Sequence, residues 1–241
     1  MQLLAEGLKQ LCAADKTAAF LFENRHEEIT AALRLYVREI ERFNAAYGLV
    51  KADNRDTLIV KHILDSLAPL GHIVRLMEKE TPANSEYFSL AGKALADIGS
   101  GAGLPGIPLA VCMPLVQVTL IERMGRRAGF LRNTCAILAS AFPLLQLSRI
   151  NVEEVELEKA LPSRYDCVVL RALSPLENTF VAALARLLKK NPNQNGIIAA
   201  YKGKHKTAQT ETDSLTDFTA ELIPLSVPFL DEERCLAVIR G

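Results

Sequence analysis

From residue 93 onward, short apolar segments alternate with longer segments that have helical periodicity. Strands separated by helices run parallel, because each helix carries the chain back across the sheet. The alternation therefore predicts an α/β fold of the Rossmann-like, doubly wound kind. The last two strands are joined by a short acidic turn, so we expect an antiparallel hairpin at the C-terminus. The expected strands are 94–98, 116–121, 144–149, 165–170, 196–201, near 221–226 and 234–240, and the expected helices are 103–112, 125–141, 151–160, 175–190 and 206–218.

The first 92 residues have a different pattern. Residues 24–47 place apolar side chains on one stripe with charges opposite, which predicts an amphipathic helix of about six turns. Residues 56–79 are helical again, with a break expected at Pro69 and Gly71. The segment 81–93 is loop-like and forms a natural boundary. We therefore expect two domains, a helical one over 1–92 and a Rossmann-like one over 93–241.

Composition sets limits on the class of protein. Hydrophobic residues make up 49% and charged residues 23% of the chain, as in ordinary soluble domains. We find neither an apolar run of the ~18–20 residues that a membrane span needs nor a secretory signal, and expect a cytoplasmic protein without a membrane partner. The five cysteines and four histidines have no metal-ligand spacing, so no metal is expected. The net charge is zero, so only local basic clusters could argue for a nucleic acid.

A glycine-rich loop follows the first predicted strand. Ligands of doubly wound sheets bind at the carboxyl ends of the strands, and this loop lies at such an end. Gly99, Gly101 and Gly103 allow a tight turn and a close approach of the backbone to a ligand. The N–H groups of the following helix would then face that ligand. The loop is therefore the first candidate for a cofactor site.

Two classes of cofactor fit this loop. Gly101-x-Gly103-x-x-Gly106 matches the dinucleotide fingerprint. The carboxylate of Asp97 would repel a pyrophosphate, yet it suits the sulfonium and amino groups of S-adenosylmethionine. Glu122 ends the second strand, where a carboxylate takes the ribose hydroxyls in either class. The residues favour S-adenosylmethionine but leave open a dinucleotide, or a loop that only packs a strand against a helix.

Longer motifs carry a resemblance to a known family. The strings DIGSGAGLPGIPLAV, LIERMGRRAGFLRN and YDCVVLRAL, with VKHILDSLAPL upstream and AAYKGK and ERCLAVIR near the end, closely resemble the bacterial small-subunit ribosomal RNA guanine-N7 methyltransferases (RsmG, formerly glucose-inhibited division protein B). The resemblance covers roughly residues 40–240. One departure is Gly48-Leu49-Val50, where the family commonly has Asn-Leu-Thr.

The resemblance implies a Rossmann-like, S-adenosylmethionine-dependent methyltransferase with an N-terminal helical cap. It implies methyl transfer to N7 of one guanine in 16S rRNA, either free or within a small ribosomal subunit precursor, and we expect a monomer. Carried over by motif, Gly99, Leu104, Val152, Glu153 and Arg171 would contact the cofactor. The full set of candidate cofactor-binding residues is Asp97, Gly99, Gly101, Gly103, Leu104, Glu122, Val152, Glu153 and Arg171.

The chemistry of the acceptor can be compared with the residues present. Methylation of cytosine C5 would need a cysteine nucleophile, but Cys167 lies in an apolar strand and is better explained as core. Guanine N7 has a free lone pair and no proton, so no general base is expected and no catalytic residue is assigned. Other readings remain open: a methyltransferase of the same fold acting on a small molecule or protein, a dinucleotide-dependent oxidoreductase, or a non-catalytic RNA-binding module.

Two basic clusters follow the second and fifth strands. Both would lie on the cofactor side of the sheet, where they could meet RNA phosphates, although solvated helix surfaces would look the same. The candidate RNA-binding residues are Arg123, Arg126, Arg127, Lys202 and Lys204. His62 and Asp65, three residues apart, would share one helix face. They could form a hydrogen-bonded pair or part of an active-site lid.

Overall fold

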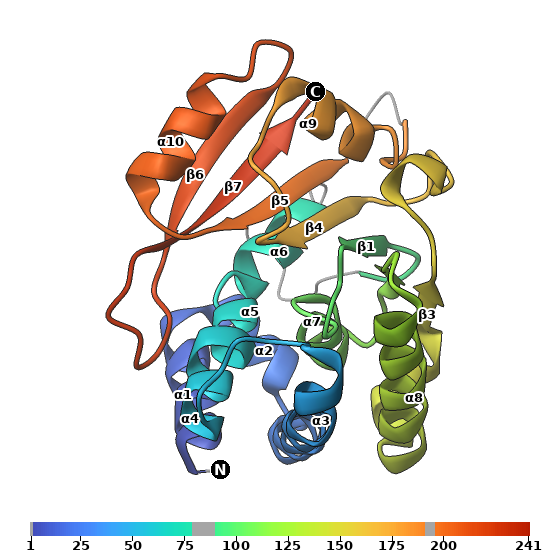
Figure 1. Ribbon diagram of the computed structural model, residues 1–241. Coiled ribbons are helices and arrows are strands. Elements are labelled where there is room, and N and C mark those ends of the chain that lie inside the picture. The colour runs from blue at the N-terminus through green and yellow to red at the C-terminus, as the bar shows by residue number, and fades with distance from the viewer. Residues whose placement is uncertain (1, 79–89, 191–195) are drawn as a thin grey trace.

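A seven-stranded sheet forms the centre of the computed structural model, which describes residues 2–78, 90–190 and 196–241 (Figure 1). The strand order is β3-β2-β1-β4-β5-β7-β6. The strands β1 to β5 are parallel, and β7 runs antiparallel to both β5 and β6. The strands are β1 Ala94–Ile98, β2 Gln117–Ile121, β3 Ile150–Glu153, β4 Cys167–Arg171, β5 Ile197–Lys202, β6 Thr219–Leu225 and β7 Arg234–Arg240. The predicted α/β sheet with a C-terminal hairpin is confirmed.

Helices cover both faces of this sheet (Figure 1). One face is covered by α1 Gln2–Ala14, α2 Lys16–Phe22, α3 His26–Tyr47, α4 Arg55–Leu58, α5 Asp65–Leu67, α6 Leu70–Met77, α7 Gly106–Cys112 and α8 Gly125–Ala141. The other face is covered by α9 Asn178–Ala185 and α10 His205–Asp213. Between α4 and α5 the chain forms a π-helix, Ile59–Leu64. Sequence analysis missed α1 and α2, whereas α8 has the predicted bounds.

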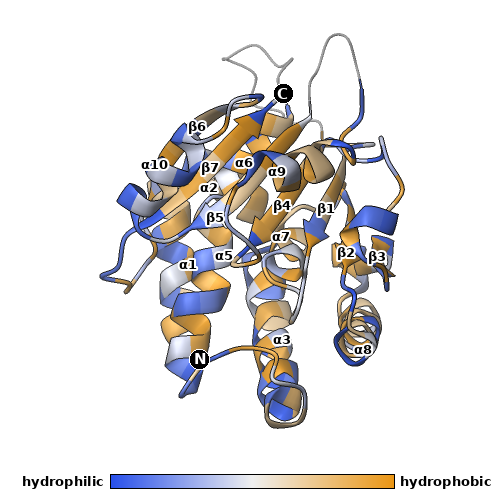
Figure 2. Cartoon of the chain, turned by 45° about the horizontal axis from the view of Figure 1, so that its top comes forward, coloured by the Kyte–Doolittle hydropathy of each residue, from blue (hydrophilic) through white to orange (hydrophobic). Residues whose placement is uncertain are grey.

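Alternation along the strands separates the two layers of core. Leu95, Val118 and Val169 face the N-terminal helices, whereas their neighbours Ile98 and Val168 face α9. This is the period of two that a strand buried on both faces requires. Figure 2 shows the result, with β4 and β7 apolar along most of their length and polar residues on the outer sides of the helices.

The third strand lies later in the sequence than predicted. Residues 144–149 were expected to form it, but they lie in two short 3-10 turns, Pro143–Leu145 and Leu147–Arg149, with Gln146 left-handed between them. The strand begins at Ile150, which pairs with Val118 of β2. The helix expected over 151–160 is absent, and only a 3-10 turn, Leu157–Lys159, forms there. Apolar residues that pack under a turn have the same composition as a short strand, which explains the error.

The helices of the first 78 residues share one core with the sheet. Buried residues from α1, α3 and the π-helix belong to the same apolar cluster as residues of β1, β2 and β4. The hydroxyl of Tyr36 in α3 donates to the carbonyl of Ala102, 2.7 Å away, in the glycine loop. Most of the loop predicted over 81–93 lies outside the described residues. The two expected domains thus pack together through a continuous apolar interface.

One helical stretch has the length and hydropathy of a membrane span. It is Arg55–Met77, with a mean hydropathy of 1.2, and sequence analysis did not recognise it as such. Within the fold, 72% of the apolar 18-residue segment of this stretch is buried, which is the environment of a core helix.

Candidate functional site

A cavity of about 600 Å³ opens at the carboxyl ends of β1, β4 and β5. From β1 the chain builds the sheet outward in one direction through β2 and β3, and then crosses to β4 on the other side of β1. This is the switch point at which doubly wound sheets bind ligands. The cavity is lined by Leu49, Val50, Lys51, Lys61, His62, Asp65, Gly99, Ser100, Gly101, Ala102, Leu104, Arg127, Arg171, Ala172, Tyr201, Lys202, Gly203, Leu225, Arg234 and Cys235.

The glycine loop forms one wall of this cavity. Gly99, Gly101 and Gly103 have φ values of 68°, 58° and 93°, in the left-handed region that side chains other than glycine rarely adopt. A Cβ added to Gly103 would lie 2.5 Å from the Cδ1 of Ile107, so this glycine is needed for packing. A Cβ added to Gly101 would meet only the carbonyl oxygen of Gly99, at 3.8 Å. Since Gly101 lines the cavity, the space above it is available to a ligand.

Asp97 lies behind the loop. It is fully buried, and its Oδ2 accepts a hydrogen bond of 3.0 Å from the N–H of Gly106. In the described parts of the chain its Oδ1 has no hydrogen-bond partner. Burial raises the pKa of this carboxyl to about 7. The carboxyl of Asp97 thus holds the start of α7, and Asp97 is not among the residues that line the cavity, so its expected contact with a cationic group of the cofactor stays a prediction.

Glu122 follows β2 and supports the loop from the side. Its Oε2 accepts from the N–H of Gly101 at 2.9 Å, and its Oε1 accepts from the N–H of Met124 at 2.8 Å. The residue is 4% exposed. These two bonds fix a carboxylate directly beside the glycine that borders the cavity, which is close to the position expected for a ribose ligand.

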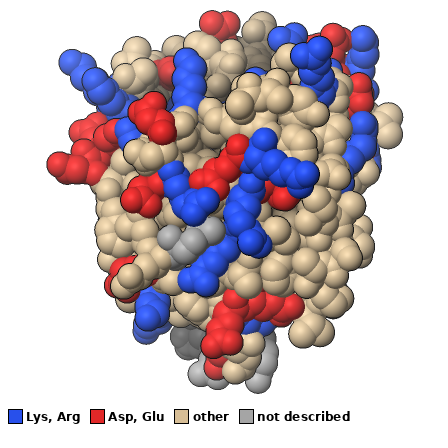
Figure 3. Space-filling view, turned by 60° about the horizontal axis from the view of Figure 1, so that its bottom comes forward, with Lys and Arg blue, Asp and Glu red and all other residues tan. Residues whose placement is uncertain are grey.

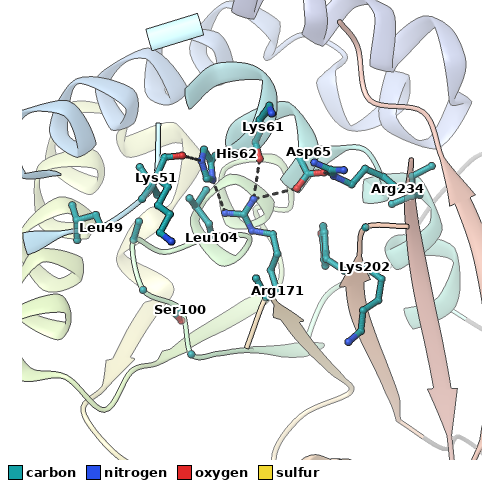
Figure 4. A pocket seen from close by; sticks show the side chains of 18 of the residues that line it. Leu49, Lys51, Lys61, His62, Asp65, Ser100, Leu104, Arg171, Lys202 and Arg234 are labelled. Carbon is teal, nitrogen blue, oxygen red and sulfur yellow. Dashed lines mark hydrogen bonds and ion pairs between the residues drawn. The ribbon is translucent and has the colours of Figure 1, made fainter. Parts of the chain in front are cut away.

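Arg171, at the end of β4, joins three parts of the fold. Its guanidinium donates to the Oδ2 of Asp65 and to the carbonyl of Lys61, both at 3.1 Å, and to the Nδ1 of His62 at 3.0 Å (Figure 4). The Nε of Arg234 in β7 lies 3.0 Å from the Oδ1 of Asp65, which is buried. His62 and Asp65 thus meet through Arg171, and they tie the π-helix to β4 and β7.

The contacts of His62 fix its protonation state. Because an arginine only donates, the Nδ1 of His62 must accept, and its Nε2–H then donates to the carbonyl of Lys51 at 3.2 Å. Burial, together with the nearby Arg171 charge, lowers the pKa of His62. His62 is therefore a neutral imidazole in the wall of the cavity.

The motif of the third strand lies away from the cavity. Val152 and Glu153 belong to β3 itself, rather than to a turn after it, and neither lines the cavity. The carboxylate of Glu153 is bound to Arg164 at 2.7 Å. Its backbone carbonyl accepts from the N–H of Glu122 at 3.0 Å. The end of β3 therefore adjoins Glu122, which supports the loop. The side chains of Val152 and Glu153 are not part of the cavity lining.

The predicted basic residues divide into three groups. Arg127 lines the cavity and donates to the carbonyl of Gly48 at 3.2 Å. Lys202 also lines it, but its Nζ lies 2.5 Å from a carboxylate oxygen of Glu211. The exposed residues outside the lining are Arg123, Arg126 and Lys204. On the face shown in Figure 3, Lys and Arg side chains are interleaved with Asp and Glu rather than gathered into one basic area.

Several lining residues were missed by sequence analysis. Tyr201 lies next to the last residue of β5 and donates its hydroxyl to the carbonyl of Ser66 at 2.8 Å, and Arg234 begins β7. Both lie in motifs that carried the family resemblance, but neither was assigned to the site, because each reaches the cavity only through the pairing of distant strands. Lys51 could have been suspected from its place directly after the Gly48-Leu49-Val50 departure. Among the described residues, no three His, Cys, Asp or Glu side chains are grouped as metal ligands.

The strand order and the glycine loop at its switch point define a Rossmann-like protein of the kind that binds a nucleoside-containing cofactor. A family model described as rRNA small subunit methyltransferase G matches residues 29–237. The chain belongs to this family of methyltransferases, which removes the dinucleotide-dependent oxidoreductase from the open alternatives.

Individual relatives agree with this assignment. The chain is 36% identical to the ribosomal RNA small subunit methyltransferase G of Treponema pallidum (strain Nichols), over 98% of this chain and 92% of the relative. It is 31% identical to the protein of that name from Nitrosomonas europaea, over 88% and 87% of the two chains. Among solved structures, a precorrin-6y C5,15-methyltransferase from Geobacter metallireducens aligns with a TM-score of 0.48 at 17% identity, over 70% of this chain and 86% of the other, which is too distant to add to the assignment.

Proposed function

We propose that this protein transfers a methyl group from S-adenosylmethionine to N7 of one guanine in 16S ribosomal RNA. The proposal is supported by membership of the rRNA small subunit methyltransferase G family, with relatives of that name matching nearly the whole chain. The structural observation that carries it is the open face of Gly101 at the switch-point cavity.

The cavity fits the cofactor. Its volume of about 600 Å³ is within the ~300–1,000 Å³ usual for small-molecule sites. Gly99, Gly101 and Leu104 border it and would hold the cofactor by backbone and apolar contact, with the carboxylate of Glu122 beside Gly101 for the ribose. When bound, the cofactor supplies a methyl group activated by its sulfonium. Arg171, already bound to Asp65, would form the far wall.

The residues of the chain then act by positioning. Guanine N7 would accept the methyl carbon with its lone pair while the sulfur of the cofactor leaves, and N7 has no proton to lose. No general base is therefore required, and holding the two reactants in line can supply much of the acceleration. The neutral His62 and the paired Arg171 provide a fixed polar wall for this purpose. Whether the base enters from free RNA or from a small-subunit precursor would not change these roles.

We further propose that the protein works in the cytoplasm as a monomer without a membrane partner. The support is the buried position of its most apolar helical stretch, Arg55–Met77, together with the ribosomal RNA substrate.

The test uses methyl-labelled S-adenosylmethionine with 16S rRNA, presented naked and as small subunits. We expect label in the RNA, and cleavage at one guanine after borohydride and aniline treatment, since N7 methylation weakens the bond to the base. Methyl incorporation without that cleavage would refute N7 as the acceptor.

Two glycine variants test the cofactor site. Gly101→Ala places a methyl group in the cavity, and we expect it to lower the affinity for S-adenosylhomocysteine at least tenfold. Gly92→Ala is the matched control, because Gly92 also has a positive φ (77°), has open space around its Cβ position and lies outside the lining. Equal affinity in the two variants would show that the loop does not contact the cofactor.

A further inference from the structure

The cationic side chains of the cavity differ in how far their charge is compensated. Four have carboxylate partners. Lys61 lies 2.6 Å from Glu232, Lys202 lies 2.5 Å from Glu211, and both Arg171 and Arg234 bind Asp65. An anion that approached such a pair would also meet the carboxylate, so its net attraction would be small.

Lys51 and Arg127 line the same cavity without such a partner. Within the described ranges, neither forms an ion pair with an Asp or Glu side chain. Arg127 makes one hydrogen bond, to the backbone carbonyl of Gly48, and its Nε has no partner among these residues. Their positive charge is therefore available to a ligand.

The two residues lie on chain segments that are joined to each other. Lys51 follows the turn that ends α3, Arg127 lies in the first turn of α8, and the bond from Arg127 to Gly48 holds these two segments together. In Figure 4, Lys51 lies on the opposite side of Arg171 from Lys202. The uncompensated charge is thus concentrated at one side of the opening, away from the lysine that sequence analysis favoured.

We propose that Lys51 and Arg127 bind a phosphodiester group of the RNA strand beside the target guanine. This inference rests on the proposed function and extends it to the substrate side of the same cavity. Two cations on segments that the Arg127–Gly48 hydrogen bond joins, one of them a guanidinium, match the charge and the oxygen geometry of a phosphate.

The exposure of the two residues favours RNA over the cofactor as the source of the anion. Lys51 is exposed and Arg127 half-buried, so both lie where the cavity meets solvent. The cofactor carboxylate, by contrast, would belong to a small molecule held inside the cavity against Gly99 and Gly101, which line it. A polynucleotide has to cross the rim of the cavity to place one base inside it, and it carries a charge at every step along that rim.

The experiment measures binding of a fluorescent, unmethylated 16S rRNA fragment that contains the guanine identified by the cleavage test. Binding is measured over a series of KCl concentrations. Each lost phosphate contact reduces the log–log salt slope by about 0.7–0.9. Because both side chains contact one phosphate, we expect the double variant to reduce the slope by about 0.7–0.9, and Lys51→Gln and Arg127→Gln each to reduce it by part of that amount. Arg127→Lys keeps the charge and should keep most of the slope. Affinity for S-adenosylhomocysteine should stay within twofold of the wild-type value.

Lys61→Gln is the matched control. It removes one charge from an exposed lysine of the same cavity, but that lysine is paired with Glu232, so we expect little change in slope. If Lys51→Gln and Arg127→Gln behave as Lys61→Gln does, the proposal is wrong. If their slopes are unchanged while the cofactor affinity falls, the pair binds the cofactor carboxylate, which also overturns it. Failure of the wild-type protein to methylate RNA would instead remove the proposed function, and this inference with it.

Discussion

A single buried carboxyl holds the strand–loop–helix junction of the site. Asp97 has no exposed surface, and the N–H of Gly106 is its one hydrogen-bond donor among the side-chain contacts that the described residues show. Gly106 itself has no room for a side chain, since a Cβ there would lie 2.7 Å from the Oδ2 of Asp97. The close approach of α7 to β1 therefore depends on both residues.

Asp97→Asn tests the cost of this burial. The pKa of Asp97 is about 7 in the folded protein, against an ordinary value of about 4 in the unfolded chain. The unfolded state thus releases this proton at lower pH, so the contribution of Asp97 to stability is greatest below pH 4 and falls as the pH rises to 7. The loss is of the order of 4 kcal/mol at 1.36 kcal/mol per pKa unit.

Urea unfolding of both proteins at pH 5 and pH 8 measures this effect. The asparagine keeps an acceptor for Gly106 but cannot ionise, so we expect the variant to gain stability relative to the wild type as the pH rises. His62, whose pKa is lowered, works in the opposite direction, but it does so equally in both proteins and cancels from the difference. Parallel pH profiles would mean that Asp97 ionises freely in the folded state.

At the scale of residues, site residues could be predicted from the sequence where a backbone conformation requires one residue type. The glycines of the loop could be assigned because a left-handed turn demands them. The replacement of a family asparagine by Gly48 has the same explanation: Gly48 ends α3 with a φ of 56°, a conformation in which asparagine is the usual substitute for glycine. Arg234 could not be assigned, because its partner Asp65 is 169 positions away.

At the scale of elements, one short helical segment fastens the N-terminal helices to the sheet. Asp65 follows the π-helix and binds arginines from β4 and β7 at once. A π-helix widens the turn, and such turns are frequent at functional sites. Here it lies next to the residues that join the helices to the carboxyl ends of the strands.

Asp65→Asn should lower the free energy of unfolding by about 3 kcal/mol, because it removes the buried carboxylate that binds two partly buried guanidinium groups, of which Arg234 keeps its ion pair with Glu232. Glu41→Gln is the control. It removes one partner of the Glu41–Arg55 ion pair, which has comparable distances but lies on the surface, so we expect a much smaller change. The measurement is chemical unfolding at neutral pH. Equal changes in the two variants would show that the Asp65 bridge gives no more stability than a surface pair.

Elements with a strong period could be predicted, and those defined by packing could not. The bounds of α8 and the position of β1 followed directly from the sequence. The break in the second helical segment also appears where it was expected, since α6 begins after Pro69. The predicted position of the third strand was wrong because Leu145 and Leu147 are buried in 3-10 turns that do not pair with β2. Buried apolar side chains alone do not distinguish a turn from a strand.

At the scale of the whole molecule, the N-terminal helices are part of the fold rather than an attachment to it. Their buried side chains belong to the apolar cluster that covers one face of the sheet, and Tyr36 holds the glycine loop from this side. Burial of apolar side chains is the dominant favourable contribution to the stability of a folded domain.

A chain of residues 93–241 should therefore fail to fold by itself. We expect it to show no cooperative urea transition and to bind a dye for exposed apolar surface. The full chain should unfold in one transition, whether observed by circular dichroism or by tyrosine fluorescence. A cooperative transition in the shortened chain would establish two independent domains, as the boundary near residue 92 first suggested.

The position of β7 has a consequence for the order in which the protein is made. This strand lies between β5 and β6, yet it follows both of them in the sequence. While the ribosome is still adding residues 203–233, β5 has an open edge and β6 has no neighbour to pair with. The sheet is therefore complete only when β7, the final strand, has paired with both β5 and β6, which precede it in the sequence. A premature stop before Arg234 would leave the apolar strand β5 with an edge of unpaired backbone N–H and C=O groups, and such an edge readily pairs with other chains.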